Sequence, residues 1–292
     1  MNIVVMGNGA WGRALASVAS KAGHHVSIWS RGLPAQNADA TILAVPAQAV
    51  RDVLPWVKSP TIISAAKGIE RSTGFTMAEI VRELKPEAEF YALSGPSFAA
   101  DVMAGLPTAV TLAGADLQRT TMLANSLSRP TFRIYASDDV TGVEIGGALK
   151  NVLAIACGVA DGRGLGESAR AGLITRGFAE LSRYGRMRGA KPETLMGLSG
   201  LGDLLLTCSS TKSRNYSFGL ALGQGKSTSV AMQNSNGVVE GAFTAKIAAE
   251  LAAKHKIEMP IISAVNAIID GKDNPDEAIA KLLARPTGIE NK

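Results

Sequence analysis

Lysine is the residue type in this sequence that is best placed to move a proton near neutral pH. The chain has three histidines: His24 and His25 precede a predicted strand, and His255 ends a predicted surface helix. Acid–base chemistry by histidine is therefore disfavoured. Lys150 and Lys67 become the candidates for that role.

Lys150 lies on a predicted helix. Apolar residues recur over 140–159 at the spacing of a helix. A lysine on a mostly buried helix is costly unless it is paired or used in chemistry. The alternative is a side chain whose tip reaches solvent at a domain edge. A stripe of small residues shares its face and would let a ligand or another backbone come close: Gly146, Gly147, Ala154 and Cys157.

A second group of polar residues follows later in the chain. A glycine-rich segment ends in Asp203 at the start of a predicted helix, and Thr207 comes one turn later. Ser213 and Asn215 flank Arg214. An arginine in this setting could bind a phosphate with both arms of its guanidinium group. The alternative is an exposed loop arginine.

The composition is that of a globular protein. Its 292 residues suggest about two domains, and 46% of them are hydrophobic. The 30 basic residues are scattered, so a nucleic-acid patch is not indicated, and the net charge of +5 would also suit an anionic small molecule. Cys157 and Cys208 show neither a pairing nor a zinc pattern, which fits a reducing cytoplasm. No metal, signal peptide or membrane span is expected.

The first residues carry a dinucleotide-binding pattern. A strand is predicted over 2–6 and a helix over 13–22, with G-x-G-x-x-G between them. Gly7 would allow the tight turn, Gly9 the approach of a pyrophosphate, and Gly12 the close packing of helix on strand. The segment also contains Asn8, Ala10 and Trp11. The alternative is a glycine-rich turn that binds nothing.

The second predicted strand, over 25–29, lacks the acidic residue that usually binds the ribose of NAD. Ser30 and Arg31 follow it instead. An arginine there can accept the 2′-phosphate of NADP. The alternative is a solvated surface arginine.

The remaining elements predict an α/β fold followed by an all-α part. Strands are expected at 41–45, 61–65, 90–93, 109–112 and 132–135, and helices at 48–57, 73–84 and 117–127. This alternation favours a Rossmann-like, doubly wound parallel sheet with ligands at the carboxyl ends of its strands, where Lys67 and residues 94–97 lie. After residue 138 only helices are expected. We therefore predict a dinucleotide-binding domain at 1–138 and a helical substrate-binding domain at 139–292.

The motifs together resemble those of the bacterial NAD(P)-dependent glycerol-3-phosphate dehydrogenases. They follow in order over nearly the whole chain, and the set is far more specific than a glycine fingerprint. The matching stretches are GNGAWG at 7–12, KGIE at 67–70, LSGPSFAADV at 93–102, EIGGALKNVLAIACG at 144–158, ARAGLITRG at 169–177, GLSGLGDLLLTCSS at 197–210, SRN at 213–215 and VVEG at 238–241.

The resemblance implies an activity and a role for individual residues. A cytoplasmic enzyme, expected to form a homodimer, would reduce dihydroxyacetone phosphate to sn-glycerol 3-phosphate with NADP(H) or NAD(H), supplying glycerophospholipid synthesis. Lys150 would be the proton donor and acceptor, and Lys67 would bind substrate and polarise its carbonyl. Substrate would further be held by Gly95, Ser97, Asn151, Asp203, Thr207, Ser213, Arg214 and Asn215. Cofactor would be held by Gly7, Asn8, Gly9, Ala10, Trp11, Gly12, Arg31, Lys67, Ala99, Arg214, Val238 and Glu240.

The chemistry of the lysines agrees with this role. Reduction of a carbonyl requires a hydride and a proton for the developing alkoxide. A cation near Lys150, either Lys67 or Arg214, is expected to lower its pKa toward neutral pH. Both ammonium groups would stabilise the oxyanion. Asp203 would orient Lys150 and oppose the loss of its charge.

Two other functions stay open at this point. A dehydrogenase with the same two-domain plan could act on a different hydroxy acid. A non-catalytic NADP-binding sensor is the other alternative, although the retained lysines and residues 213–215 argue against it.

The connection after the second strand is unusually short. The related enzymes carry a longer insertion with a helix and a further strand, whereas residues 31–40 alone make the crossing here. The path over one face of the sheet is about 22 Å, and such a segment can reach about 33 Å when extended. We therefore expect a shortened sheet with the second strand at its edge. Cofactor binding should be weaker, with a preference for NADPH through Arg31.

Overall fold

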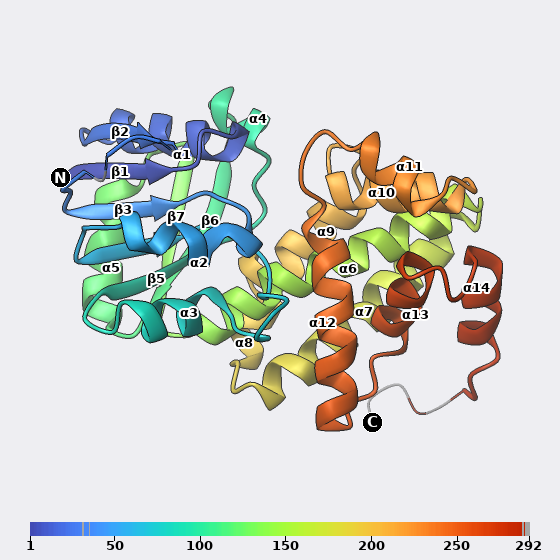
Figure 1. The fold of residues 1–292 in the computed structure, drawn as a ribbon. Coiled ribbons are helices and arrows are strands. Elements are labelled where there is room, and N and C mark those ends of the chain that lie inside the picture. Colours follow the sequence, from blue (N-terminus) through green and yellow to red (C-terminus); the bar gives the residue numbers. More distant parts are fainter. Residues whose placement is uncertain (31, 35, 288, 290–292) are drawn as a thin grey trace.

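The computed structural model describes residues 1–30, 32–34, 36–287 and 289. A strand-rich part, blue to green in Figure 1, packs beside a helical part, green to red. The last strand ends at Ser137 and the first long helix begins at Val140. We propose the domain boundary at residues 138 and 139, because the change from sheet to helices falls between these elements.

The first part contains a seven-stranded sheet. Its strands are β1 (Asn2–Met6), β2 (His25–Trp29), β3 (Ala40–Leu43), β4 (Thr61–Ser64), β5 (Glu89–Ser94), β6 (Thr108–Gly114) and β7 (Phe132–Ser137). They lie in the order β2-β1-β3-β4-β5-β6-β7. This order confirms the doubly wound fold class.

Two strands depart from the predicted parallel arrangement. The five strands β2, β1, β3, β4 and β5 run parallel to one another. Strand β6 runs antiparallel to β5, and β7 runs parallel to β6. The connection from β5 to β6 carries only the five-residue helix α4 (Ala99–Met103). An antiparallel return needs no long crossover, so this short segment suffices.

Helices cover both faces of the sheet. Helices α1 (Ala10–Lys21), α4 and α5 (Leu117–Leu127) pack on one face. Helices α2 (Val50–Val53) and α3 (Met77–Leu84) pack on the other. The predicted helix 48–57 is broken into α2 and two flanking 3-10 turns, and Pro55 lies in the second turn. The predicted helix 73–84 starts later, because Thr76 and Glu79 form a capping box before α3.

The short crossing after β2 takes the predicted form. In the described residues between β2 and β3 there is neither a helix nor another strand, and β2 lies at the edge of the sheet. Trp29 donates from Nε1 to the carbonyl of Leu33 at 3.0 Å, and the amide of Asp39 donates to the carbonyl of Asn2 at 2.9 Å. These bonds bring the loop back to the start of β3. Arg31 lies outside the described residues.

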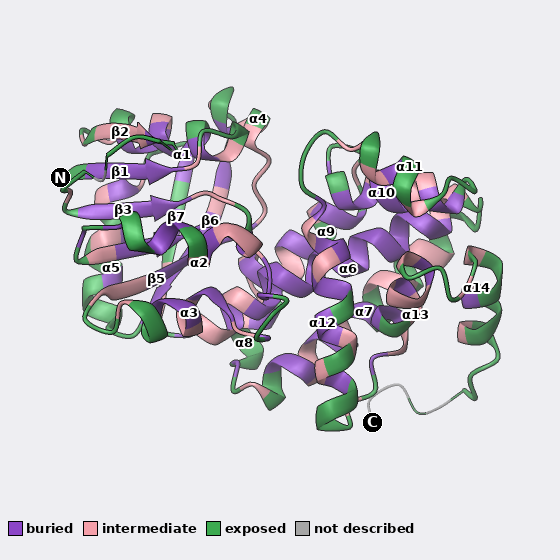
Figure 2. Ribbon diagram, in the orientation of Figure 1, coloured by how far each residue is buried: buried purple, intermediate pink, exposed green. Residues whose placement is uncertain are grey.

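The second part consists of helices around α6 (Val140–Gly162), which is buried along most of its length in Figure 2. This helix is long and apolar enough to cross a membrane, but its most apolar window is completely buried inside the protein. It is therefore a core helix. The other elements are α7 (Gly166–Met187), α8 (Pro192–Met196), the π-helical turn η3 (Leu198–Gly202), α9 (Asp203–Cys208), α10 (Arg214–Gly223), α11 (Thr228–Gln233), α12 (Glu240–His255), α13 (Pro260–Ile269) and α14 (Pro275–Leu283).

Helices α6 and α10 cross at glycines. A Cβ placed on Gly158 would lie 2.1 Å from the carbonyl oxygen of Tyr216. One placed on Gly219 would lie 2.1 Å from that of Ile155. Both contacts are with main-chain atoms that cannot rotate away. The glycines therefore set how closely α10, which begins with Arg214, approaches α6.

We predict that Gly219→Ala lowers the free energy of unfolding by about 1–3 kcal/mol, because the added methyl group overpacks this crossing. The matched control is Gly172→Ala on α7, where a Cβ would meet nothing within 4 Å. That control should be neutral, or stabilising by up to about 1 kcal/mol. Urea denaturation measures both, and equal stability of the two variants would contradict the packing argument.

Candidate functional site

Lys150 is buried, and its ammonium group has two hydrogen-bond partners. Its Nζ donates to Asp203 Oδ1 at 2.9 Å and to Thr207 Oγ1 at 2.7 Å. Only 6% of Lys150 and 1% of Asp203 is exposed. The alternative of a lysine whose tip reaches solvent is therefore wrong. Helix α9 places Asp203 and Thr207 one turn apart, so both face the same ammonium group.

Lys67 shares the same carboxylate. Its Nζ donates to Asp203 Oδ2 at 2.7 Å and to the carbonyl of Gly95 at 2.9 Å. Lys67 follows β4 and Gly95 follows β5, so both lie at carboxyl ends of parallel strands, as predicted. Asp203 therefore connects a lysine of the sheet to a lysine of α6.

The surroundings of Lys150 lower its pKa from the usual 10.5 to about 8. Burial is the largest cause, the charge of Asp203 opposes it, and the charge of Lys67 adds to the lowering. The expected cation near Lys150 is Lys67, although burial contributes more than Lys67 to the lowering of the Lys150 pKa. An ammonium group with this pKa can give up and regain a proton close to neutral pH.

The small residues on α6 admit other parts of the chain to this site. A Cβ on Gly146 would lie 2.7 Å from the carbonyl of Ser199 in η3, the turn that precedes Asp203. One on Gly147 would lie 2.7 Å from Ser94 Oγ and 3.5 Å from Lys67 Cγ. The stripe thus admits a backbone on one side and the Lys67 side chain on the other.

Two asparagines link α6 to α10 and α12. Asn151 donates from Nδ2 to the carbonyl of Lys67 at 3.2 Å and accepts from Asn215 Nδ2 at 2.9 Å. Asn215 Oδ1 accepts from the amide of Gly241 at 2.9 Å. Both side chains are buried. Their positions near Lys67 agree with the predicted site, and their direct binding of substrate stays a prediction.

The other predicted substrate residues lie around this centre. Ser97 donates to the carbonyl of Gly95 at 3.0 Å. Ser213 caps α10 by accepting from the amide of Tyr216 at 3.2 Å, so its hydroxyl already has a structural use. Arg214 is exposed, and a Cβ on Gly237 would lie 2.9 Å from its Nη1. This guanidinium group is accessible to an anion, and the loop before α12 lies against it.

The glycine-rich segment forms an open cradle at the amino end of α1. Gly7 has a φ of 118°, and a Cβ there would lie 2.6 Å from the carbonyl of Ala44. A Cβ on Gly12 would lie 1.9 Å from the carbonyl of Gly7. Gly9 has no atom within 4 Å of its Cβ position, and the first turn of α1 carries no acidic residue. An anion can therefore approach these amides.

Glu240 spans from the helical part to the sheet part. Its Oε1 accepts from the amide of Ala47 at 3.0 Å, and its buried Oε2 has no hydrogen-bond partner among the described residues. Burial raises its pKa, while the charge of Arg214 lowers it. Of the neighbouring predicted cofactor residues, Val238 is exposed and Ala99 is half-buried at the start of α4. An unpartnered acceptor here could receive a hydroxyl donor from a ligand.

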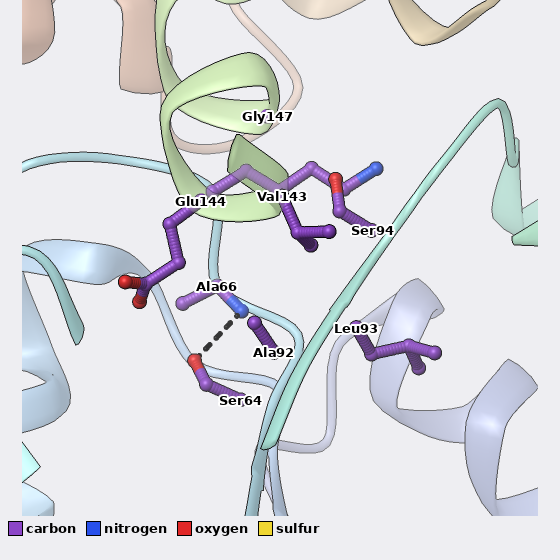
Figure 3. A pocket seen from close by; sticks show the side chains of 9 residues that line it. Ser64, Ala66, Ala92, Leu93, Ser94, Val143, Glu144 and Gly147 are labelled. Atoms are coloured by element: carbon purple, nitrogen blue, oxygen red, sulfur yellow. Dashed lines mark hydrogen bonds between the residues drawn. The ribbon is translucent and has the colours of Figure 1, made fainter. Parts of the chain in front are cut away.

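Two further polar residues, Ser94 and Glu144, line a pocket with Lys67. Residue 94 was expected at the carboxyl end of its strand, whereas no role was predicted for Glu144. Figure 3 shows the pocket that Ser94 on β5 and Gly147 on α6 line, with the Glu144 side chain pointing away from Ser94. Ser94 Oγ is buried without a partner among the described residues. Glu144 accepts from the amide of Ala78 at 2.9 Å, and burial raises its pKa to about 7. Both lie inside the matching stretches of the sequence, but only the fold shows that Ser94 is buried and that Glu144 is half-buried against α3.

Comparison with known proteins identifies the family. The amino-terminal domain of the NAD-dependent glycerol-3-phosphate dehydrogenases matches residues 2–36 and 32–120, and the carboxy-terminal domain matches residues 139–280. The chain belongs to this family. A glycerol-3-phosphate dehydrogenase [NAD(P)+] of Brucella ovis is 49% identical, with 99% of each chain covered. One of Methylobacterium radiotolerans is 51% identical, covering 97% of this chain and 96% of its relative.

A solved structure agrees. The glycerol-3-phosphate dehydrogenase of Coxiella burnetii is 35% identical and superposes with a TM-score of 0.91, covering 97% of this chain and 99% of that one. The match to the amino-terminal family domain is interrupted, because its two segments, 2–36 and 32–120, overlap at residues 32–36. The alignment with the Brucella ovis enzyme extends over 327 positions, although this chain has 292 residues. The chain is therefore shorter than that relative, and the interruption coincides with the short crossing.

We predict that Asp203→Asn lowers the pKa of Lys150 below the present value of about 8, because burial and Lys67 would act without an opposing anion. Carbon-13 NMR of the lysine side chains over a pH titration measures this shift. The control is Asp101→Asn, which removes the partner of the surface residue Lys212. An unchanged or raised pKa in Asp203→Asn would show that Asp203 does not hold the charge of Lys150.

Proposed function

We propose that this protein reduces dihydroxyacetone phosphate to sn-glycerol 3-phosphate, reversibly, with NADPH or NADH, and that Lys150 transfers the proton. The observation that carries this proposal is the pair of lysines on one buried carboxylate. Lys150 and Lys67 both donate to Asp203, at 2.9 and 2.7 Å. Family membership agrees with the activity, and the product is a precursor for glycerophospholipid synthesis.

Lys150 supplies the proton in the direction of reduction. With a pKa of about 8 it is mostly protonated at neutral pH and can donate to the carbonyl oxygen as that oxygen becomes an alkoxide. In the reverse direction the neutral amine accepts the proton. Lys67 places a second positive charge beside the same oxygen, which stabilises the negative charge that develops there. The nicotinamide cofactor, when bound, supplies the hydride.

The exposed guanidinium group of Arg214 binds the substrate phosphate in this proposal. It lies at the amino end of α10, where the helix dipole adds to its positive charge. Ser213 and Asn215 hold this helix end in place through the cap and the bond to Asn151. The net charge of +5 also suits a doubly charged phosphate ester.

The cofactor, NAD(H) or NADP(H), fits the open cradle at the start of α1. Gly7, Gly9 and Gly12, with Asn8, Ala10 and Trp11 between them, leave room for its pyrophosphate against the helix amides. The unpartnered Oε2 of Glu240 offers it an acceptor. Ala99, Val238, Lys67 and Arg214 are the further cofactor contacts of this proposal. Recognition of the 2′-phosphate by Arg31 stays a proposal on sequence grounds.

The substrate assay separates this function from its two alternatives. Purified protein should oxidise NADPH with dihydroxyacetone phosphate and reduce NADP⁺ with sn-glycerol 3-phosphate. It should not reduce NADP⁺ when 3-hydroxy acids or 6-phosphogluconate replace sn-glycerol 3-phosphate. Faster turnover of a hydroxy acid would favour the other dehydrogenase, and nucleotide binding without turnover of any of these compounds would favour the sensor.

Lys150→Ala should reduce kcat for dihydroxyacetone phosphate by about 100- to 10,000-fold, the usual contribution of general acid catalysis. NADPH binding should change little, because Lys150 contacts the α9 side chains and not the glycine-rich segment. Steady-state kinetics and fluorescence titration measure the two effects. A variant that keeps more than about a tenth of the wild-type kcat would rule out Lys150 as the acid.

The short crossing should weaken cofactor binding and leave the catalytic groups intact. The loop after β2 replaces one wall of the adenosine site, whereas Lys67, Lys150 and Asp203 lie on other elements. NADPH and NADH titrations, run beside the Brucella ovis relative, should give larger dissociation constants here and a preference for NADPH that Arg31→Ala removes. Submicromolar NADH binding that is tighter than NADPH binding would contradict both points.

We infer a cytoplasmic location and a homodimer from the resemblance and from the unpaired pattern of the two cysteines, which are free and buried in the structure. Light scattering of the purified protein tests the dimer. A monomer at all concentrations would refute it.

A further inference from the structure

A continuous hydrogen-bonded path joins the amino end of α12 to the main chain of Lys67. The amide of Gly241 donates to Asn215 Oδ1 at 2.9 Å, and Asn215 Nδ2 donates to Asn151 Oδ1 at 2.9 Å. Asn151 Nδ2 then donates to the carbonyl of Lys67 at 3.2 Å. The residue before Gly241 is Glu240, which holds the amide of Ala47 at 3.0 Å. With the contact of Glu240 included, α12 is tied to the turn after β3 at Ala47 and, through the path, to the loop after β4 at Lys67.

We propose that Gly241 and Asn215 are positioning residues that form a strut, with Asn151, between α12 and Lys67 and thereby set the distance of the Lys67 ammonium from Asp203 and Lys150. This inference rests on the proposed function for its kinetic consequences. Neither residue is assigned a part in proton transfer. The effect of the strut on catalysis passes through Lys67 and is separate from the predicted contact of Asn215 with substrate.

The position of Gly241 accepts no side chain. A Cβ there would lie 2.5 Å from the carbonyl oxygen of Asn151 and 2.9 Å from Asn215 Oδ1. The first is main chain of α6, and the second is held by its bond to the Gly241 amide. Gly241 lies in the first turn of α12, where amides have no partner within the helix. The absence of a side chain thus lets an otherwise unpaired amide reach Asn215.

The two asparagines suit the path because each offers a donor and an acceptor. Asn215 accepts from α12 through its oxygen and donates to α6 through its nitrogen. Asn151 repeats this order between α10 and Lys67. A buried amide with both ends bonded is fixed in orientation, because releasing either end leaves an unpaired polar group. The strut can therefore transmit the position of α12 to Lys67.

Displacement of Lys67 would change the pKa of Lys150. The charged and titratable groups that act on Lys150 are Lys67, Asp203 and Cys208. If Lys67 moves away, Lys150 loses a repelling cation and keeps the whole of the Asp203 charge. Its pKa should rise from about 8. Reduction should slow, because Lys67 no longer supports the developing oxyanion, and its alkaline limit should move to higher pH.

The test uses Gly241→Ala and Asn215→Leu in the full-length protein, with Gly172→Ala as the matched control, since a Cβ there meets nothing within 4 Å. Both strut variants should lose about 10- to 100-fold in kcat for dihydroxyacetone phosphate, the scale of small misplacements of a reacting group. The pKa of Lys150, followed by carbon-13 NMR, should rise in both. The control should match the wild type in both measurements.

Two results would overturn the strut. One is a pKa of Lys150 and a kcat that stay at wild-type values in either variant. The other is a loss of activity with an unchanged pKa of Lys150, which would indicate general structural damage. The NMR measurement needs no turnover, so it decides the strut even if the wild type fails to reduce dihydroxyacetone phosphate. That failure would refute the proposed function instead.

Discussion

A carboxylate that is removed from water stays ionised only if cations or hydrogen-bond donors replace its hydration, and Asp203 is almost completely buried. Lys150 and Lys67 meet this need, one on each oxygen. The two lysines come from different parts of the chain, α6 and the loop after β4. The carboxylate therefore keeps two like charges together, and it couples the helical part to the sheet.

Close approach of backbones makes that meeting possible. Gly146 and Gly147 on α6 let η3 and the Lys67 side chain come within van der Waals contact, so Asp203 can enter from one side and Lys67 from the other. The crossing of α6 and α10 at Gly158 and Gly219 sets how closely α10, which begins with Arg214, approaches α6. Any side chain at these positions would move a charged group, because the opposing atoms are mostly main chain. Helix α6 therefore carries glycine at the positions where η3, Lys67 and α10 come close to it.

Local patterns predict much of this molecule, and long-range contacts account for the rest. The strand, glycine turn and helix at the start have a local signature, and so does the switch to helices after residue 138. The partnership of Lys150 and Asp203 could be anticipated from their motifs. The sharing of Asp203 with Lys67 could not, since it depends on how two parts of the chain pack. The reversal of β6 and the contact of Glu144 with the amide of Ala78 also depend on neighbours that are distant in sequence.

The pH dependence of kcat/KM for the reduction of dihydroxyacetone phosphate tests the central claim most directly. Reduction requires protonated Lys150, which is present below its folded pKa and lost as the pH rises through that value. The rate should therefore be constant near neutral pH and fall tenfold per unit above about pH 8. Oxidation of sn-glycerol 3-phosphate should show the opposite limb. A reduction rate that stays constant to about pH 10, near the pKa of an ordinary lysine, would contradict the account.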